Sequence, residues 1–380
     1  MIVYVKELKN VLLINNIKNF VKNNVELRVY NSEVVLGCSD YILVSQQDIN
    51  ALMEDTRDQI IVYEVAFNKV IESVFKEYQN NWEHYFYKNA INKAKDNATR
   101  TIITGSSYGL LGVDESMLDE AVNLSLTSQD LYYSIRTIYE VCESNVNIEN
   151  IVLCCSYYYL YSDMSRSQNV DSQMRVAKIY NPLFGDVHNA VVVPMTTNFL
   201  VDSCIFDVER IMNLYAEGEY RKHYFNAKRP RKNFALRLWT DKGKDWNQLT
   251  DEERTIAAME RARLHNKNQK HQITYYENFE LLKGLVAYCE ERKINLVVLI
   301  APVTNLYADN MWEGYQEVFY KTLNDIDGVV HLLDLYQDDR YTDDDFIDTD
   351  HLSDSGAKKM TVDVLNLLWS MRENAGKEDY

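Results

Sequence analysis

Between residues 97 and 375, short and almost wholly apolar segments alternate with longer segments of mixed apolar and charged residues. The apolar segments are TIIT (101–104), AVNLS (121–125), NIVLCCS (150–156), INLVVLIAP (294–302) and GVVHLLDL (328–335). Strands that are apolar on both faces are typical of a parallel sheet that helices cover on both sides. The pattern therefore predicts an α/β domain over residues 97–375, built on a doubly wound parallel five-stranded sheet.

The segment between the third and fourth predicted strands is too long for a single crossover helix. It contains Pro182, Pro194 and the basic run RKHYFNAKRPRKNF (221–234). Ligands of open α/β sheets bind beyond the carboxyl ends of the strands, and this segment leaves the sheet at such an end. We therefore expect residues 160–275 to form a lid-like insertion over the sheet edge.

The first 96 residues have a different pattern. Within residues 1–50 the β-branched runs NVLLI, VELRVY, EVVLG and YILVS are separated by Asn, Ser and Gly, which predicts a small α/β appendage. In residues 51–96, Val70, Val74 and Tyr78 return to one face of a helical pattern. We expect this second stretch to be a helical segment that connects the appendage to the sheet domain.

Composition excludes several classes of protein. The chain has 380 residues, of which 46% are hydrophobic and 26% charged, as in globular domains. Its formal net charge of −17 argues against binding to nucleic acid, which needs clustered cations. We find no apolar stretch long enough to cross a bilayer and no long apolar signal segment, so we expect no integral membrane segment and a cytoplasmic location.

The six cysteines form no C-x-x-C pair, and no Cys/His group has the spacing of a zinc site. Cys154 and Cys155 lie within a predicted strand and are expected to be core residues. The acidic run DDDFIDTD (343–350) lacks the glycine and spacing of a calcium loop. We therefore expect neither a metal nor an organic cofactor.

Two polar groups stand at the ends of predicted strands. Ser107 follows the first strand of the sheet in TGSSYG, where its hydroxyl could project at the carboxyl edge. Asp348 and His351 follow the last strand, and among the seven histidines His351 alone has a carboxylate at short spacing in a predicted loop. Asp348 could then fix the tautomer of His351 and leave Nε2 facing Ser107. Asp350 is a competing partner for the imidazole.

Each of these features also has a purely structural interpretation. Gly-Ser-Ser after a strand is often only a turn, and an acidic loop before a helix is often only solvated, with Ser353 or Asp354 capping the helix. The basic run 221–234 is either a solvated turn or an anion site, in which Arg229 and Arg231 would hold a phosphate or another anionic substrate group. The order of Ser, Asp and His along the sheet favours the catalytic interpretation.

The same residues resemble the SGNH (GDSL-type) hydrolase and acyltransferase superfamily, which has a flavodoxin-like sheet. Its Gly-Asp-Ser block matches Gly105-Ser106-Ser107, and its Asp-x-x-His-Leu-Ser-x-x-Gly block matches residues 348–356. Its Asn-x-Ser-x-x-Gly block matches residues 123–128, with Ser128 in place of Gly. The third block, Gly-x-Asn-Asp, is missing, and Ser156 or Tyr157 stands in the place of its Asn.

The resemblance implies specific roles. Ser107, His351 and Asp348 would be the catalytic triad, and the oxyanion hole would use Ser107, Ser128 and Ser156. Asn123 and Tyr157 would contact the substrate. The motifs GSS, NLSLTSQDLYY and the end of the fourth strand, IAPVT, look most like the branch associated with acyl modification of bacterial surface polysaccharides and teichoic acids.

The expected function is therefore ester hydrolysis or acyl transfer through a covalent serine intermediate. The acyl group would be O-acetyl or similar, carried by a small molecule, a bacterial glycan or a glycan precursor. The alternative is a non-catalytic SGNH-like module that binds a glycan or a partner protein, because the third block is missing. A nucleotide-binding protein is a weaker alternative, since the chain has neither a Gly-x-Gly-x-x-Gly nor a Walker loop.

Overall fold

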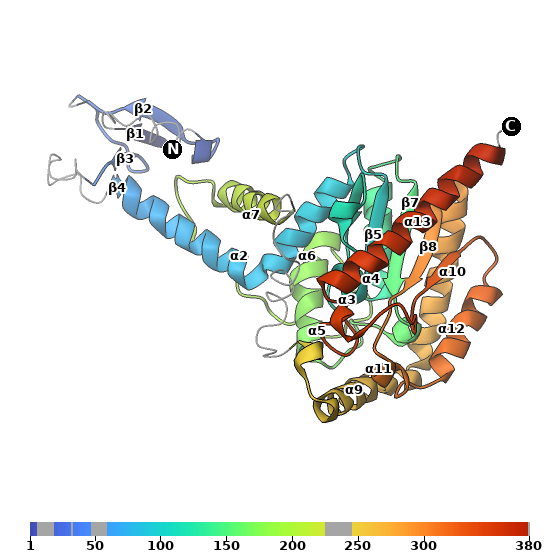
Figure 1. The fold of residues 1–380 in the computed structure, drawn as a ribbon. Coiled ribbons are helices and arrows are strands. Elements are labelled where there is room, and N and C mark those ends of the chain that lie inside the picture. The colour runs from blue at the N-terminus through green and yellow to red at the C-terminus, as the bar shows by residue number, and fades with distance from the viewer. Residues whose placement is uncertain (6–18, 32, 47–58, 225–244, 379–380) are drawn as a thin grey trace. The chain divides into compact units, whose positions relative to one another are not determined.

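The computed structural model describes residues 1–5, 19–31, 33–46, 59–224 and 245–378 (Figure 1). The chain divides into two compact units. The first contains Met1–Phe86 and Thr196–Arg221, and the second contains Tyr87–Met195 and Lys222–Tyr380. Among the residues described, no helix combines the length and the apolarity needed to cross a membrane.

The second unit is built on the predicted parallel sheet. Its strands are β5 (Thr101–Gly105), β6 (Ala121–Asn123), β7 (Asn150–Cys155), β8 (Asn295–Ile300) and β9 (His331–Asp334). They are ordered β6-β5-β7-β8-β9, and every neighbouring pair is parallel. Each predicted strand is confirmed within a few residues, and so is the α/β class.

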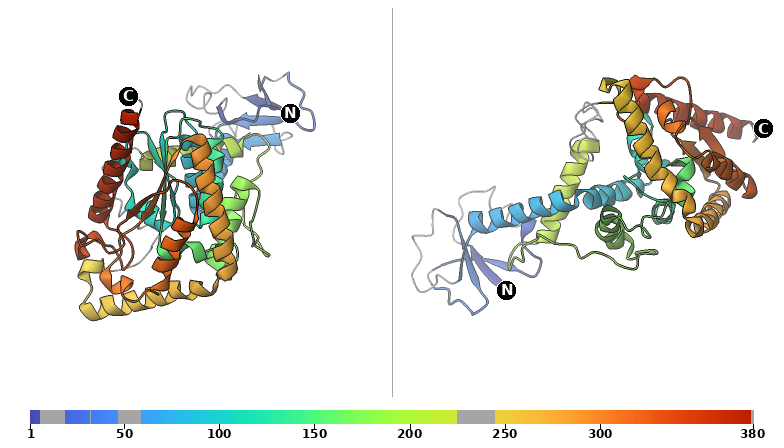
Figure 2. Two further views of the ribbon diagram at one scale, coloured as in Figure 1. Left: turned by 90° about the vertical axis from the view of Figure 1, so that its right-hand side faces the viewer. Right: turned by 90° about the horizontal axis from the view of Figure 1, so that it is seen from below.

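Helices cover both faces of this sheet, as the left-hand view of Figure 2 shows for α13 and α10. The helices of the unit are α3 (Ser107–Gly112), α4 (Leu131–Cys142), α5 (Val170–Arg175), α6 (Asn181–Phe184), α9 (Asp251–Asn266), α10 (Gln272–Arg292), α11 (Asn305–Ala308), α12 (Gly314–Asp325) and α13 (Asp354–Glu378). A π-helical turn, η5 (Val176–Tyr180), precedes α6. The 3₁₀ turns are η3 (Glu115–Met117), η4 (Tyr157–Tyr161), η6 (Trp246–Gln248), η7 (Lys267–Lys270) and η8 (Asp343–Asp345).

The core of this unit explains why the strands are apolar throughout. Ile103, Val152 and Val297 from three neighbouring strands are fully buried, and α13 packs Met360 and Val364 into the same cluster. Cys154 and Cys155 are buried in β7, as expected. Burial on both faces leaves no position for the polar alternation of a half-exposed strand.

The first unit holds a second all-parallel sheet, ordered β2-β1-β3-β4. Its strands are β1 (Ile2–Val5), β2 (Glu26–Val29), β3 (Tyr41–Val44) and β4 (Ile60–Val62). Val3 and Leu43 pack in a core with Val70 of α2 (Tyr63–Ala94) and Met212 of α7 (Val208–Tyr224). The first unit is therefore a sheet with its own helices and its own core.

Several details of the first 96 residues differ from the expectation. EVVLG forms no strand, and its Val35 is 90% exposed. Residues 2–5, which the pattern analysis did not assign, form β1, and Ile61 belongs to β4 rather than to a helix. NVLLI lies outside the described residues. These strands have three or four residues, too few for a period to be recognised.

The unit boundaries also differ from the predicted ones. The division falls between Phe86 and Tyr87, inside α2, whose backbone leaves the helical region at Asn81. Part of the predicted insertion 160–275, residues 196–221, belongs to the first unit. Helix α9, from the same predicted insertion, belongs to the second unit. The insertion is therefore not one body.

Gly105, at the end of β5, offers a test of this architecture. Its φ is +127°, and a Cβ there would lie 1.9 Å from the backbone oxygen of Cys154 in the neighbouring strand. We expect Gly105→Ala to lower the free energy of unfolding by more than about 2 kcal/mol in chemical denaturation. The matched control is Gly284→Ala on the exposed side of α10, where a Cβ meets nothing within 4 Å. It should raise stability by about 0.5–1 kcal/mol, and an equal loss for both variants would contradict the expectation.

Candidate active site

The sequence-predicted serine and histidine meet at the carboxyl edge of the five-stranded sheet. Ser107 is the first residue of α3, directly after β5, and the side chain of Ser106 caps this helix by accepting from the N–H of Tyr108. The Ser107 Oγ and His351 Nε2 atoms are 2.9 Å apart, although 244 positions separate the residues. Ser107 is 8% exposed and His351 is 3% exposed, so this hydrogen bond is largely shielded from water.

Asp348 holds the other side of the imidazole. His351 Nδ1 donates to Asp348 Oδ1 at 2.9 Å and lies 3.0 Å from Oδ2. The same carboxylate accepts the backbone N–H groups of Asp350 and His351, at 3.1 and 2.9 Å. A carboxylate can only accept, so Nδ1 carries the proton and Nε2 is left to accept from the Ser107 hydroxyl.

Asp350, the competing partner, has a different task. Its Oδ1 lies 3.4 Å from His351 Nδ1, farther than either oxygen of Asp348. Asp350 is 1% exposed, and both of its oxygens accept from Arg261 Nε, at 3.1 and 3.0 Å. Burial would raise the pKa of Asp350, but the charges of His351 and Arg261 hold that pKa below its ordinary value. Asp350 is therefore a buried, charge-balanced carboxylate beside the hydrogen-bonded series Ser107–His351–Asp348.

Tyr108 connects Asp350 to the imidazole ring. Its hydroxyl donates to Asp350 Oδ2 at 2.9 Å, and its ring stacks on that of His351 with 5.4 Å between centroids. Burial raises the pKa of this phenol well above its usual value, so Tyr108 stays neutral and remains a donor. The stack and the hydrogen bond together restrict the orientation of His351.

Two residues of this site were missed by the sequence analysis. Arg261 and His265 project from α9, one helical turn apart, and both line the same cavity as Ser107. His265 stacks on Tyr158 with 4.3 Å between centroids, and its Nδ1 bonds to the Tyr307 hydroxyl. The i, i+4 spacing of Arg261 and His265 was the available signal, but nothing in the sequence tells which face of α9 meets the sheet edge.

A cavity of about 550 Å³ opens over Ser107. Ser128 lines it from the loop after β6, Tyr158 and Tyr161 line it from η4, and Arg261 lines it from α9. Serine and tyrosine hydroxyls make up much of its wall, so the cavity suits a polar ligand.

Two of the three predicted oxyanion residues share this cavity. Ser128 has φ +58°, the left-handed conformation that favours the glycine of the family motif. Neither the N–H of Ser107 nor that of Ser128 donates a hydrogen bond within the described part of the chain. Ser156 lines a different cavity and is not brought together with them.

The predicted substrate-binding residues lie elsewhere. The Asn123 amide donates to the backbone oxygens of Gly109 and Val113, at 2.9 and 3.1 Å, and does not line the cavity. Tyr157 donates to Asp334 Oδ2 at 2.5 Å and faces the cavity of Ser156. Arg229 and Arg231 lie outside the described residues.

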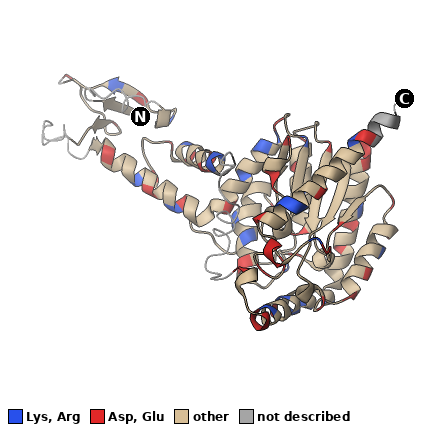
Figure 3. Cartoon of the chain, viewed as in Figure 1, with Lys and Arg blue, Asp and Glu red and all other residues tan. Residues whose placement is uncertain are grey.

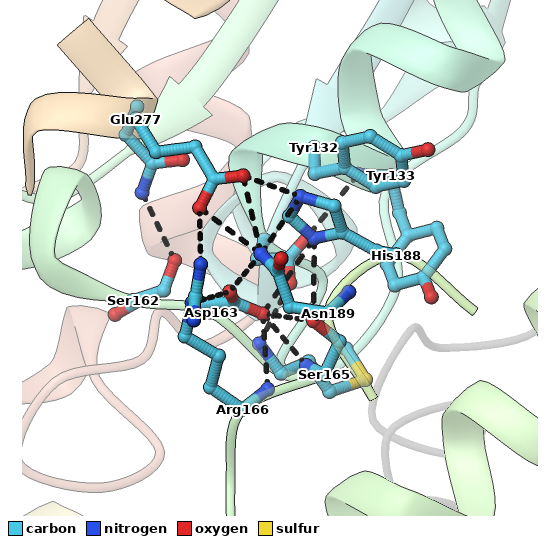
Figure 4. A network of polar contacts seen from close by, with 12 residues as sticks. Tyr132, Tyr133, Ser162, Asp163, Ser165, Arg166, His188, Asn189 and Glu277 are labelled. Atoms are coloured by element: carbon cyan, nitrogen blue, oxygen red, sulfur yellow. Dashed lines mark hydrogen bonds and ion pairs between the residues drawn. The ribbon is translucent and has the colours of Figure 1, made fainter. Parts of the chain in front are cut away.

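A second polar network is drawn in Figure 4, and it reaches the cavity through Asp163 and Arg166. His188, in the loop after α6, faces Glu277 of α10 through Nε2 at 3.0 Å and Ser165 through Nδ1 at 3.2 Å. Arg166 pairs with both Asp163 and Glu277, each at 3.0 Å. Burial would lower the pKa of His188, but the hydrogen bonds and charges of Asp163 and Glu277 raise it above its ordinary value.

Two groups have the donor atoms for a metal ion: Asp163 with His188 and Glu277, and Asp348 with Asp350 and His351. In the first group Arg166 already pairs with both carboxylates, and His188 Nε2 already bonds to Glu277. In the second group both ring nitrogens of His351 are engaged, and Arg261 holds Asp350. An ion at either place would have to displace these partners, so we assign no metal to them.

Acidic residues occupy the first turn of α9 (Asp251, Glu252 and Glu253) and the three positions of η8; acidic residues are red in the cartoon of Figure 3. Trp246 Nε1 and Arg254 donate to Asp343 there. These contacts fasten the start of α9 to the loop that carries Asp348 and His351.

Comparison with known proteins adds no name to this site. No family model matches the sequence, and no curated protein matches it significantly. The functional interpretation therefore rests on the residues and on their geometry.

His265 of the cavity wall and His188 of the second polar network should have pKa values shifted in opposite directions. Burial and the charge of Arg261 lower the pKa of His265 to about 3, whereas the pKa of His188 is raised. In an NMR titration we expect the His265 imidazole to stay neutral down to about pH 5. As the pH is lowered, His188 should take up its proton at a higher pH than an ordinary histidine does. Arg261→Gln should raise the pKa of His265, because it removes a nearby cation.

The sign of the associated stability change follows from the same shift. Between about pH 6.5 and 3 the unfolded chain binds a proton at residue 265 that the folded chain does not bind. His265 therefore lowers the stability as the pH falls through this window. A His265 signal that titrates near 6.5 in the wild-type protein would contradict the expectation.

Proposed function

We propose that this chain is a serine-dependent esterase or O-acyltransferase of the SGNH type. The observation that carries the proposal is the continuous hydrogen-bonded series from Ser107 Oγ through His351 to Asp348, with donor–acceptor distances of 2.9 Å at both steps. A serine hydroxyl becomes a nucleophile when a positioned base takes its proton, and a third group orients that base.

In the proposed reaction the Ser107 oxygen attacks an ester or thioester carbonyl while His351 Nε2 takes the hydroxyl proton. Asp348 stabilises the imidazolium, which then gives its proton to the leaving alcohol or thiol. An acyl-serine remains, and the reverse steps pass the acyl group to water or to an acceptor hydroxyl. Every proton in this cycle passes through His351, from Ser107 to the leaving group and then from the water or acceptor hydroxyl back to Ser107, so the cycle needs no cofactor.

The backbone N–H groups of Ser107 and Ser128 are the proposed oxyanion donors. Each is without a partner in the described part of the chain, and both residues line the cavity. Removing one donor of an oxyanion hole typically costs about 10²–10³ in rate. A site with two donors is therefore expected to be a slow hydrolase, or to act on an activated acyl donor.

The position of the three residues in the sheet supports the SGNH type. The nucleophile follows β5, the first strand of the five, and Asp348 and His351 follow β9, the last. The hydroxyl-rich cavity supports a polar acceptor, such as the hydroxyl of a bacterial glycan or its precursor that carries an O-acetyl or similar group.

The alternative is a non-catalytic module that binds a glycan or a partner protein. The observation in its favour is the missing Gly-x-Asn-Asp block, whose position is taken by Ser156 and Tyr157 beside a separate cavity. A protein of this kind would keep the cavity over Ser107 but would carry out no turnover.

A fluorophosphonate probe separates these two functions. If Ser107 is the activated nucleophile, the wild-type protein is labelled and hydrolyses p-nitrophenyl acetate, and Ser107→Ala loses both reactions. Ser370→Ala, on the exposed face of α13, is the matched control and should behave as wild type. A folded wild-type protein that neither labels nor hydrolyses would support the binding module.

The two aspartates beside His351 should differ in their effects. Asp348→Asn disturbs the tautomer of His351 and should lower kcat by about 10⁴, with little change in fold, as for an orienting triad aspartate. Asp350→Asn should lower kcat less than Asp348→Asn does but should lower the melting temperature, because Arg261 would lose its carboxylate partner and the Tyr108 hydroxyl would lose a charged acceptor. Equal losses of kcat from both variants would mean that Asp350 orients the base as well.

A further inference from the structure

A second cavity of about 310 Å³ lies at the carboxyl ends of β7, β8 and β9. It does not include Ser107, His351 or Asp348 in its wall. Six tyrosines and Trp312 line it, together with Ser156 and the carboxylates of Asp309 and Glu313. No lysine, arginine or histidine is among the lining residues.

Its aromatic rings are held at fixed angles to one another. The rings of Trp312 and Tyr315 meet edge to face with 4.9 Å between centroids, and those of Tyr157 and Tyr336 are 4.7 Å apart at 49°. A Cβ on Gly314 would come within 2.3 Å of the Trp312 ring, so the absence of a side chain there allows the ring its place. Rings of this kind present electron-rich faces in several directions.

The tyrosines of the wall are neutral at physiological pH. Burial raises the pKa of Tyr158 to about 12, and it raises the pKa of Tyr307 well above its usual value. Hydrogen bonds also fix some of the phenols: Tyr157 donates to Asp334, and Gln316 donates to the Tyr157 oxygen at 3.1 Å. The wall therefore attracts cations through its rings, without ionised phenolates.

The two carboxylates of the wall have no cation to balance them in the described part of the chain. Asp309 ends α11, and Glu313 precedes α12; both are exposed, and neither takes part in an ion pair with a described residue. Aromatic faces together with unbalanced carboxylates are the recognition chemistry of organic cations.

Ser156 gives an independent indication of a ligand. It is 5% exposed, and its Oγ makes no hydrogen bond within the described residues, although it lies near the Tyr158 phenol. A buried hydroxyl without a partner is costly, and a polar group of a ligand would satisfy it.

We propose that this cavity binds a small alkylammonium cation that also carries a hydroxyl group. The aromatic faces and the carboxylates of Asp309 and Glu313 would hold the ammonium group, and the Ser156 hydroxyl would bond to the ligand hydroxyl. This proposal does not depend on acyl transfer at Ser107. The two cavities share Tyr158 as part of their walls, so a bound cation would touch a residue of the other site.

Choline is the probe, with isothermal titration calorimetry and Trp fluorescence as readouts on the full chain. Choline should bind saturably, and the uncharged isostere 3,3-dimethylbutanol should bind at least about fivefold more weakly. Trp312→Phe should abolish most of the choline-dependent fluorescence change, and Trp312→Ala should weaken binding about fivefold or more. Absence of saturable choline binding, or equal affinity for dimethylbutanol, would overturn the proposal.

Matched variants separate the contribution of the Glu313 carboxylate from that of the Ser156 hydroxyl. Glu313→Gln should weaken choline binding several-fold, whereas Glu317→Gln, further along α12 and outside the cavity wall, should leave it unchanged. Ser156→Ala should weaken choline but leave tetramethylammonium, which has no hydroxyl, unaffected. Ser107→Ala should bind choline as wild type does, so a failure of the proposed esterase leaves this test intact. Equal effects of Glu313→Gln and Glu317→Gln would exclude the carboxylate contact.

Discussion

The hydrogen bond between Ser107 and His351 depends on the distance that the loop after β9 must cross. In the order β6-β5-β7-β8-β9, three strand spacings separate β5 from β9, a span of about 14 Å. Residues 335–351 have to return over the ends of β8 and β7. Thr304, directly beyond β8, anchors this return by donating its N–H and its hydroxyl to the oxygen of Thr349, at 3.2 and 2.8 Å. Trp246 provides a second anchor through its N–H to the oxygen of Ile347, at 3.1 Å.

The return of this loop buries the carboxylate of Asp350 in the protein interior, where Arg261 and Tyr108 bind it. An isolated buried carboxylate would be strongly unfavourable, and its pKa would rise until it was neutral. Arg261 and the Tyr108 hydroxyl instead keep Asp350 ionised. Because Arg261 comes from α9, the segment between β7 and β8 is linked to the loop that carries Asp348 and His351 through a charge pair as well as through packing. The pair is a constraint on geometry rather than a clear gain in stability, since desolvation offsets much of the attraction.

Much of this arrangement could be predicted from the sequence, and the reason is physical. Strands β5 to β8 are buried almost throughout and therefore produce apolar runs in the sequence. A parallel sheet collects the carboxyl ends of its strands at one edge, so Ser107, Asp348 and His351 could be placed together. The first unit resisted prediction because its strands have three or four residues, and β2 is largely exposed. Arg261 and His265 were missed because α9 has few apolar residues to mark its inner face. Asn123 was predicted to contact the substrate, but its amide donates to two backbone carbonyls, one within α3 and one directly after it. A polar residue in a motif can stabilise the backbone instead of binding a ligand.

The sequence lacks the Gly-x-Asn-Asp block after β7, and a short 3₁₀ segment stands at that place in the structure. The chain turns at Ser156 into the 3₁₀ segment Tyr157–Tyr161, and the Tyr158 hydroxyl of this segment is hydrogen-bonded to the Tyr108 hydroxyl of α3 at 3.2 Å. Tyr158 lines both the cavity over Ser107 and the aromatic cavity, whereas Tyr108 and Ser156 line only the aromatic one. Because the chain enters this 3₁₀ segment directly after Ser156, the Tyr158 ring reaches the walls of both cavities, while the buried Ser156 hydroxyl has no hydrogen-bond partner among the described residues.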